Sequence, residues 1–393
     1  MRKLILATAA GALMATGALA DDVKIGVILG FTGPIESLTP PMADSAELAW
    51  KEINASGEFL GGKTIVSVRA DSTCIDSAAA TSAAERLVTA ENVAAIMGAD
   101  CSGVTTAILN NVAVPNGIVM VSPSATSPAL STIEDKGLFF RTAPSDARQG
   151  QVLAGILKDK GIGEVAVTYT NNDYGKGLSD SFISSFEGMG GKVTINAAHE
   201  DGKGDYSAEV GALASAGGDV LAVLGYADQG GLGIIQNALD TGAFDTFAMG
   251  DGMYADSLLA AVGTDIEGSI GSVPWSQGEG SEKFVAAAQA AGINPSSFTR
   301  ESYDAAALIA LAMQKGGNAD RATVAANLLA VANAPGEKIL PGELGKALKI
   351  LAGGGDVDYV GATNVELIGP GEAAGTYREY VIKGGAYETV KFR

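Results

Sequence analysis

Residues 98–130 of the 393-residue chain read GADCSGVTTAILNNVAVPNGIVMVSPSATSPAL, and their pattern indicates the class of fold. A helix is predicted at residues 103–112. It joins two apolar strands, which are expected at residues 93–97 and 118–122. Such a βαβ unit has parallel strands. Polar residues follow both strands, at Ser102 and from Ser122 onward. They therefore lie at the strand ends where doubly wound sheets bind ligands.

The same alternation of β-branched and Ala-rich runs extends in both directions. In the first part of the chain, strands are expected at residues 23–29, 64–70, 93–97 and 118–122, with helices at 42–54, 76–90 and 103–112. The pattern restarts after residue 145, with strands at 165–170, 193–197, 220–224 and 247–249 and helices at 147–160, 177–189, 206–216 and 230–241. Two such sets predict an α/β protein with two doubly wound parallel-sheet lobes.

The last third of the chain is expected to return to both lobes. Helices at 282–291, 302–315 and 321–331 have no strong strands between them, so we assign them to the first sheet, while strand-like residues 378–382 and 388–392 rejoin the second. Three crossings, near residues 141–144, 273–275 and 355–363, then form a three-strand hinge. The expected lobes are residues 21–141 plus 276–357, and residues 142–275 plus 358–393.

The first 20 residues have the features of a secretory signal peptide. Arg2 and Lys3 precede an apolar stretch that ends in Ala18-Leu19-Ala20, which predicts cleavage before Asp21 and a periplasmic protein. A transmembrane anchor is the alternative, but a span needs about 20 strongly apolar residues, and this stretch is shorter and diluted with Gly and Ala.

Composition excludes several functions. The formal net charge of −19 argues against nucleic acid or an anionic membrane as a partner. One histidine, His199, and two cysteines are too few for a Cys/His zinc site, and no Gly-x-Ser-x-Gly elbow accompanies His199, which we interpret as a surface or packing residue. The Gly98-x-x-x-x-Gly103 spacing lacks the lysine of a phosphate loop. We therefore expect no catalytic residue, metal or cofactor.

The two cysteines, Cys74 and Cys101, are expected to form a disulfide, because an even pair in an exported protein usually bridges. The remaining candidate features also have simpler interpretations. Ser102 is placed to act as the N-cap of a helix whose free N–H groups suit a carboxylate, but a capped helix needs no ligand. Likewise, Tyr174 alone fits a packed aromatic residue, and Asp251 fits an Asp-Gly turn.

A family resemblance decides between these interpretations. The chain resembles the periplasmic leucine/isoleucine/valine-binding proteins, which are type I solute-binding proteins of ABC transporters. The resemblance spans essentially the whole chain after the expected signal peptide, and its motifs are specific in their order. They are VKIGVI and GFTGP (residues 23–34), DSTC (71–74), GADCS (98–102), SPSATSPAL (122–130), FFRTAP (139–144) and NDYGKG (172–177).

The resemblance implies a set of ligand contacts, and it also implies the Cys74–Cys101 bridge. The contact residues are Ser102, Ser124, Ala125, Thr126, Tyr174, Tyr226 and Asp251. Ser102 and Thr126 would hold a ligand carboxylate, while the Ser124 carbonyl and the Thr126 hydroxyl would receive its ammonium.

The second lobe would complete the site with Tyr174, Tyr226 and Asp251, which close over the α-amino and α-carboxyl groups. Asp251 stands where close relatives usually carry Glu. Residues 35–40 depart from the usual form of a segment that touches the ligand side chain, so branched-chain specificity is not carried over.

The function implied is that of a monomeric, extracytoplasmic receptor for a small amino acid or related amine-bearing carboxylate. Its partners would be that ligand and an inner-membrane ABC permease. The alternatives are a sensory ligand-binding module and a receptor for a small amide or aromatic carboxylate. A secreted enzyme on the same fold is a third, which the single histidine and the missing nucleophile and dinucleotide motifs argue against.

Overall fold

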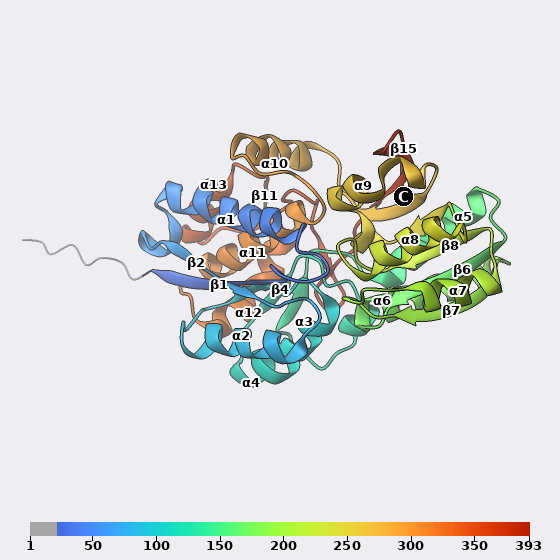
Figure 1. Cartoon of the computed structure of the whole chain (residues 1–393). Coiled ribbons are helices and arrows are strands. Elements are labelled where there is room, and N and C mark those ends of the chain that lie inside the picture. Colours follow the sequence, from blue (N-terminus) through green and yellow to red (C-terminus); the bar gives the residue numbers. More distant parts are fainter. Residues whose placement is uncertain (1–21) are drawn as a thin grey trace, which may run out of the picture.

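Two seven-stranded sheets, one in each lobe, carry the fold. The computed structural model describes residues 22–393, so the expected signal peptide at residues 1–20 lies outside the described residues. Figure 1 shows the lobes beside each other, with the first set of strands and helices (blue to cyan) in one lobe and the second set (green to yellow) in the other. The two sheets confirm the fold predicted from the alternating pattern.

The first sheet has the strand order β13-β14-β5-β4-β3-β1-β2. Its strands are β1 (Val23–Leu29), β2 (Ile65–Asp71), β3 (Ile96–Gly98), β4 (Met120–Ser122), β5 (Phe139–Arg141), β13 (Leu367–Ile368) and β14 (Glu372–Ala373). The helices of this lobe are α1 (Thr39–Ser56), α2 (Ser77–Thr89), α3 (Ser102–Ile108), α4 (Val114–Asn116), α10 (Glu279–Ala290), α11 (Thr299–Gly316), α12 (Arg321–Ala332) and α13 (Leu344–Ala352). Helices α1 and α11 lie on one side of β1, and α2 and α3 on the other (Figure 1).

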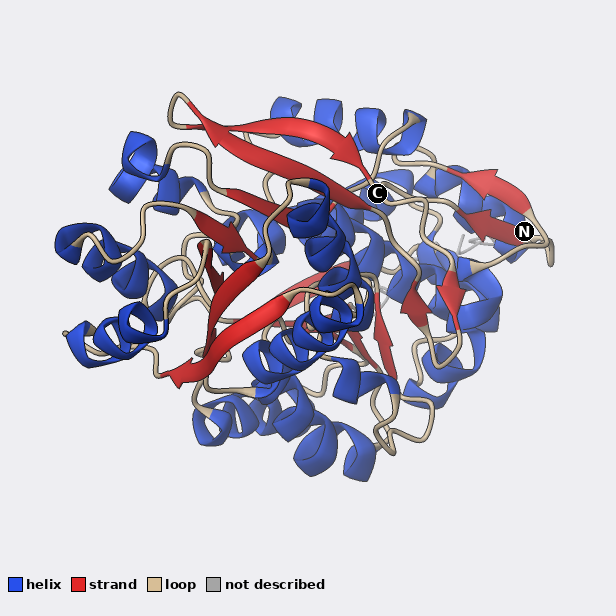
Figure 2. Ribbon diagram, turned by 90° about the vertical axis from the view of Figure 1, so that its right-hand side faces the viewer, coloured by secondary structure: helices blue, strands red, loops and turns tan. Residues whose placement is uncertain are grey.

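The second sheet has the order β16-β15-β10-β9-β8-β6-β7. Its strands are β6 (Glu164–Thr170), β7 (Lys192–His199), β8 (Val220–Leu224), β9 (Phe247–Met249), β10 (Ile270–Pro274), β15 (Tyr377–Lys383) and β16 (Ala386–Phe392). Its helices are α5 (Asp146–Asp159), α6 (Asp173–Gly188), α7 (Ser207–Ala216), α8 (Gly230–Thr241) and α9 (Asp256–Val262). Figure 2 looks onto this lobe, where the twisted sheet runs between layers of helices.

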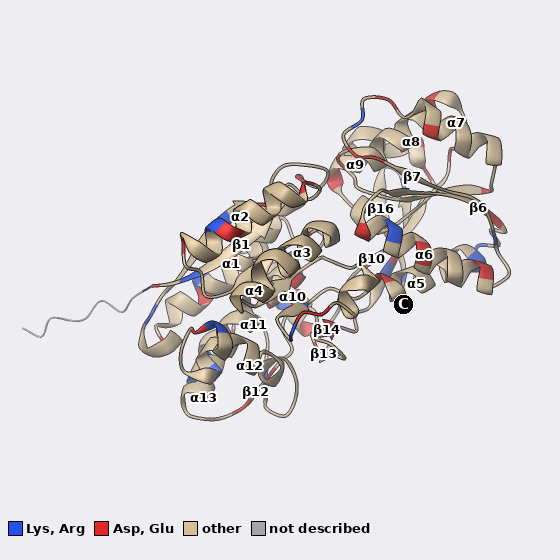
Figure 3. Ribbon diagram, turned by 90° about the horizontal axis from the view of Figure 1, so that it is seen from below, with Lys and Arg blue, Asp and Glu red and all other residues tan. Residues whose placement is uncertain are grey.

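Helices cover both faces of each sheet, which explains why the central strands consist of consecutive apolar residues. In β1, Ile25, Val27, Ile28 and Leu29 are all fully buried, as expected for a parallel strand between two helical layers. Burial of each such side chain stabilises the fold by about 1.5–3 kcal/mol. At the surface, lysine and arginine mix with aspartate and glutamate over both lobes (Figure 3). Among the helices of residues 22–393, none combines the length and apolar character that crossing a membrane requires.

The third crossing differs from the expectation. Residues 357–373 stay with the first lobe: β12 (Val357–Tyr359) pairs with β11 (Glu337–Ile339), and Glu372 of β14 pairs with Arg141 of β5. The chain makes its third change of sheet between β14 and β15, so the crossing expected at residues 355–363 and the lobe boundary expected at residue 358 are wrong.

A buried carboxylate on α11 explains why this segment stays with the first lobe. Asp304 accepts hydrogen bonds of 2.8 Å from the Tyr359 hydroxyl and from the backbone N–H groups of Ala362 and Thr363. These bonds hold the segment against α11. They join residues more than 50 positions apart, so the local sequence pattern does not predict them.

The disulfide is confirmed. Cys74 follows β2, Cys101 follows β3, and the two residues are bonded with Cα atoms 5.2 Å apart. In the loop-entropy description, closing a loop of this length stabilises the fold by about 3–4 kcal/mol. The bridge also ties down the turn from which Ser102 opens α3.

Candidate ligand-binding site

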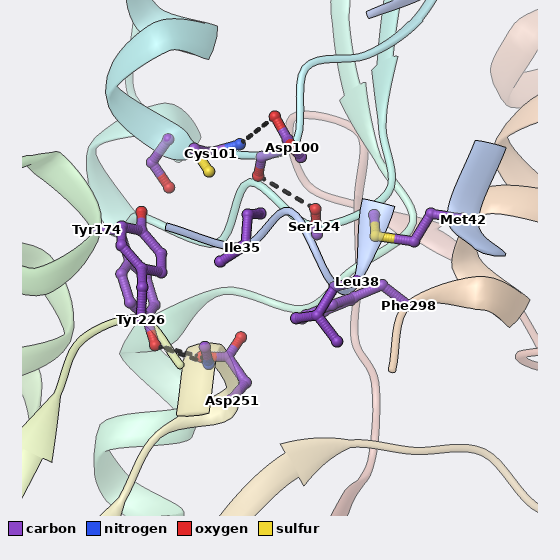
Figure 4. Close-up of a pocket in the computed structure, with 12 residues that line it drawn as sticks. Ile35, Leu38, Met42, Asp100, Cys101, Ser124, Tyr174, Tyr226, Asp251 and Phe298 are labelled. Atoms are coloured by element: carbon purple, nitrogen blue, oxygen red, sulfur yellow. Dashed lines mark hydrogen bonds between the residues drawn. The ribbon is translucent and has the colours of Figure 1, made fainter. Parts of the chain in front are cut away.

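A cavity lies between the lobes, at the carboxyl ends of the strands. The empty volume there is about 360 Å³, with adjoining open solvent included. Figure 4 shows the residues around it: the Tyr174 and Tyr226 rings to one side, Asp251 at one end, Ser124 and Asp100 at the other, and Ile35 and Leu38 between them. The residues that line it are Ile35, Leu38, Met42, Asp100, Cys101, Ser102, Ser124, Tyr174, Tyr226, Asp251, Gly252 and Phe298.

Asp100, in the loop after β3, is hydrogen-bonded to the loops after β1, β2 and β4 of the first lobe. Its buried carboxylate accepts hydrogen bonds from Gly30 N–H at 2.6 Å, Cys101 N–H at 3.0 Å and the Ser72 hydroxyl at 3.1 Å. The Ser124 hydroxyl donates to the Asp100 carbonyl at 3.1 Å. The loops after β1, β2, β3 and β4 are thus linked through one residue, which fixes the wall of the cavity.

Arg141 holds the loop that carries Ser124, Ala125 and Thr126. Its side chain is 1% exposed and donates to the carbonyls of Ala125 and Ser127 at 3.0 and 2.9 Å. Glu372 accepts from the same guanidinium and forms an ion pair with it. The Ala125 carbonyl therefore accepts a structural hydrogen bond from Arg141, and the guanidinium of Arg141 stabilises this loop.

The second lobe contributes two tyrosines and a carboxylate. The Tyr174 hydroxyl donates to Asp251 Oδ1 at 2.6 Å and accepts from Gly252 N–H at 3.1 Å. The Tyr174 ring stacks on Tyr226, with centroids 5.1 Å apart. Position 252 requires glycine, because a Cβ there would lie 2.6 Å from the Gly225 carbonyl oxygen. This close packing presents Asp251 to the cavity.

Burial controls the charge of these groups. It raises the pKa of Asp251 to about 6, although the hydrogen bonds from Tyr174 and Gly252 act in the opposite direction. Burial also raises the pKa of both tyrosines well above the ordinary value, so their phenols are neutral at pH 7. At neutral pH the cavity therefore offers hydroxyl groups at one side and an anionic Asp251 at one end.

The rest of the cavity wall is apolar. Ile35 and Leu38 come from the loop after β1, Met42 from α1, and Phe298 from the residue before α11. All four side chains are at most 6% exposed. Phe298 has φ = 59°, a left-handed conformation that costs a residue other than glycine about 1–2 kcal/mol. Its ring is thereby held against the cavity.

Direct contacts between the lobes enclose the cavity. Asp228 of the second lobe accepts from the Ser37 N–H and hydroxyl groups of the first at 2.8 and 2.9 Å. On another side, the Thr106 hydroxyl donates to Asp173 at 3.0 Å. A Cβ at Gly177 would approach Pro128 to 2.7 Å, so the lobes also pack closely there. The structure is therefore a closed form of the two lobes.

The structure brings five of the seven expected contact residues together around the cavity: Ser102, Ser124, Tyr174, Tyr226 and Asp251. Ala125 and Thr126 are buried and do not line it. Ser102 is the first residue of α3 and not its N-cap, which is Cys101. The Ser102 hydroxyl instead accepts from Ser127 N–H at 3.1 Å, which ties the two polar loops together.

Several cavity residues were not among the expected contacts. They are Ile35, Leu38, Met42, Asp100, Cys101, Gly252 and Phe298. The unusual form of residues 35–40 was the one signal for this group, since that segment was expected near the ligand side chain. Phe298 is far from the other cavity residues in sequence and reaches them only because α11 folds back onto the first sheet.

His199 has a packing role. It is 1% exposed, and its Nδ1 lies 2.8 Å from the Thr168 hydroxyl. Burial lowers its pKa to about 4, which keeps the ring neutral at pH 7. Across residues 22–393, no group of three or more His, Cys, Asp or Glu side chains is arranged to hold a metal ion.

A closed cavity between two doubly wound lobes joined by three crossings defines a two-lobed ligand-binding protein. The family model described as periplasmic binding protein matches residues 22–344. A Leu/Ile/Val-binding protein homolog from Brucella melitensis is 30% identical over 78% of this chain and 83% of its own. The chain therefore belongs to the periplasmic binding protein family, within its branched-chain-amino-acid group of solute-binding receptors.

Solved structures agree with this assignment. A leucine-binding protein from Thermotoga maritima superposes with a TM-score of 0.77 at 25% identity, over 94% of this chain and 98% of its own. A solute-binding protein of an ABC transporter from R. palustris, in complex with benzoate, has a TM-score of 0.74 at 18% identity, over 95% and 96% of the two chains. The second likeness concerns the fold alone.

Proposed function

We propose that this protein is a periplasmic receptor that closes around a small amino acid with an aliphatic side chain and delivers it to an inner-membrane ABC permease. The proposal rests on one observation: the wall of the cavity has a polar part and an apolar part. Hydroxyl groups and the Asp251 carboxylate form one part of its wall, and Ile35, Leu38, Met42 and Phe298 form the other.

Each part of the wall suits one part of such a ligand. An ammonium carries three donors, which an anionic carboxylate accepts, and a carboxylate accepts from the serine hydroxyls. Apolar contacts suit an aliphatic side chain, because its burial removes apolar surface from water.

The relatives support the same class of ligand. The Brucella melitensis relative is named for leucine, isoleucine and valine, and the Thermotoga maritima structure for leucine. In our proposal the protein is exported to the periplasm, acts as a monomer and catalyses no reaction. Ligand contacts from both lobes stabilise the closed form, and the permease recognises that form.

A binding screen tests the proposal. Thermal unfolding is measured with L-leucine, L-isoleucine, L-valine and L-alanine, and with benzoate and acetamide for the alternative ligand classes. A ligand at 100 times its dissociation constant stabilises the native state by about 2.7 kcal/mol. We expect stabilisation by aliphatic amino acids and none by benzoate or acetamide. Stabilisation by benzoate or acetamide alone would refute the proposed ligand class.

A further inference from the structure

Trp275 lies between charged groups of the two lobes. It follows β10, on the second crossing. The guanidinium carbon of Arg300, on α11 of the first lobe, lies 4.4 Å from the centre of the indole ring. The guanidinium carbon of Arg378, on β15 of the second lobe, lies 5.0 Å from the same point. One arginine of each lobe therefore makes a cation–π contact with a single indole, and we call these three side chains the hinge stack.

Each arginine of the hinge stack is anchored in its own lobe. Arg300 Nε donates to the Ser281 hydroxyl of α10 at 2.8 Å. Arg378 donates to the Tyr254 hydroxyl at 2.6 Å and to the Tyr387 carbonyl at 3.0 Å, both in the second lobe. Because these hydrogen bonds stay within one lobe, each guanidinium moves with the lobe that carries it.

The backbone of Trp275 is tied to the crossings. Its N–H donates to the Thr376 carbonyl of the third crossing at 2.9 Å, and the Thr376 hydroxyl donates to the Trp275 carbonyl at 2.6 Å. The next residue, Ser276, donates to the Thr363 carbonyl of the first lobe at 2.8 Å. A cavity beside Trp275 is lined by residues of all three crossings, among them Thr142 of the first. The crossings do not fill this space, so the contact of the indole with the two arginines is not duplicated there.

Rotation of the lobes changes the hinge stack. When the lobes rotate against each other, Arg300 and Arg378 move relative to each other, so at least one of them must change its position over the indole. In this closed form the Arg300 side chain is 6% exposed. A cation that has lost its water gains more from an aromatic face than an exposed cation does. Weakening this contact therefore opposes opening.

We propose that Trp275 is a positioning residue, which stabilises the closed orientation of the lobes through the hinge stack and thereby raises ligand affinity. Trp275 does not line the ligand cavity, so it acts only through the orientation of the lobes. The inference rests on the proposed function in one respect, namely that a ligand drives closure. It does not depend on which ligand that is.

A simpler role for Trp275 gives different results. If the indole only packs at the hinge, its removal lowers the unfolding temperature and leaves ligand affinity and the closed fraction unchanged. In the proposed role, affinity and closed fraction both fall, and a variant that keeps an aromatic ring retains part of them.

Isothermal titration with L-leucine and small-angle scattering compare the parent with Trp275→Leu, Trp275→Phe and the control Trp50→Phe. Trp50 is buried within the first lobe, where its Nε1 donates to the Ala306 carbonyl at 3.0 Å. We expect Trp275→Leu to bind leucine roughly three- to ten-fold more weakly, the size of one cation–π contact, and to be more open without ligand. Trp275→Phe should lie between Trp275→Leu and the parent, and Trp50→Phe should match the parent in affinity.

A second readout follows the indole itself. The chain has two tryptophans, so Trp275 is the only one left in Trp50→Phe. L-Leucine should shift the fluorescence emission of that variant, because closure changes the positive charge beside the ring. A residue that only packs would give no such shift.

The inference is wrong if Trp275→Leu keeps the affinity and compactness of the parent, or if leucine binds Trp50→Phe without a change in emission. Should Trp275→Leu fail to fold, Trp275→Phe and the emission of Trp50→Phe decide. A parent that binds none of the aliphatic amino acids refutes the proposed function alone. The compactness of the ligand-free variants then decides the inference.

Discussion

Asp228 connects the lobes across the mouth of the cleft and lies outside the cavity, so its replacement tests whether closure contributes to affinity. Its carboxylate accepts two hydrogen bonds from Ser37 of the first lobe, at 2.8 and 2.9 Å, and a third from Ser257 of its own lobe at 2.5 Å. Asp228→Ala removes both bonds between the lobes. These bonds exist only when the lobes are closed.

The size of the effect follows from the exposure of the contact. A hydrogen bond to a charged group contributes about 1.5–3 kcal/mol when it is buried, but Ser37 is exposed, so each bond should contribute only about 0.5–1 kcal/mol. Two bonds then favour the closed form by about 1–2 kcal/mol, which is roughly a 5- to 30-fold change in the closing equilibrium. Because the ligand binds tightly only to the closed form, the dissociation constant should rise by up to this factor, and by less where the ligand-free parent is already partly closed.

Isothermal titration of L-leucine measures the dissociation constant, and small-angle scattering measures the closed fraction without and with ligand. The control is Asp240→Ala, an exposed acidic residue on α8 of the same lobe. We expect weaker binding and a more open ligand-free protein for Asp228→Ala alone, with thermal unfolding of the ligand-free protein unchanged. An unchanged dissociation constant would refute the reasoning, as would an equal loss in the control.

Four further predictions concern single groups. Asp251→Asn should weaken L-leucine binding by about 2–5 kcal/mol in calorimetry without loss of thermal stability, and unchanged affinity would contradict the assignment of Asp251 to the ammonium. Because the pKa of Asp251 is about 6, leucine affinity of the parent should fall as pH drops from 7 to 5, since protons compete for the carboxylate; a flat profile would argue against it. Burial raises the pKa of Glu301 from 4.5 to about 7, so the native state binds more protons than the unfolded state between these values and loses stability as pH rises. Glu301→Gln should thus stabilise the protein at pH 8 by up to about 3 kcal/mol in denaturant unfolding, unlike Glu187→Gln at an exposed position. Finally, N-terminal sequencing of the exported protein should begin at Asp21, and a retained leader would show that it is not cleaved.

The local patterns predicted most of the secondary structure. Apolar runs placed β1, β8 and β9 at their observed bounds, because strands buried on both faces need continuous apolar residues. Helices with one buried face, such as α8, were located equally well. The short strands β13 and β14 were missed, since two residues each carry too little pattern and depend on pairing with β5.

The residues of the candidate site also fall into those that the sequence predicted and those that it missed. Strand ends and the family motifs led to Ser102, Ser124, Tyr174, Tyr226 and Asp251, all of which the fold gathers around one cavity. Residues such as Met42 and Asp100 were missed. Met42 lies on the buried face of α1, where an apolar side chain is equally expected in any core. The role of Asp100 depends on hydrogen bonds to Gly30 and Ser72, which sequence does not reveal.

Residue type and periodicity along the chain were enough to predict the class of fold, the two sets of βαβ units and the paired cysteines. The place of the third crossing and the position of Phe298 beside the cavity became clear only from the three-dimensional structure. These depend on contacts between distant parts of the chain. Arg141 and Glu372, for example, are 231 residues apart, and only packing of the whole lobe brings their charges together.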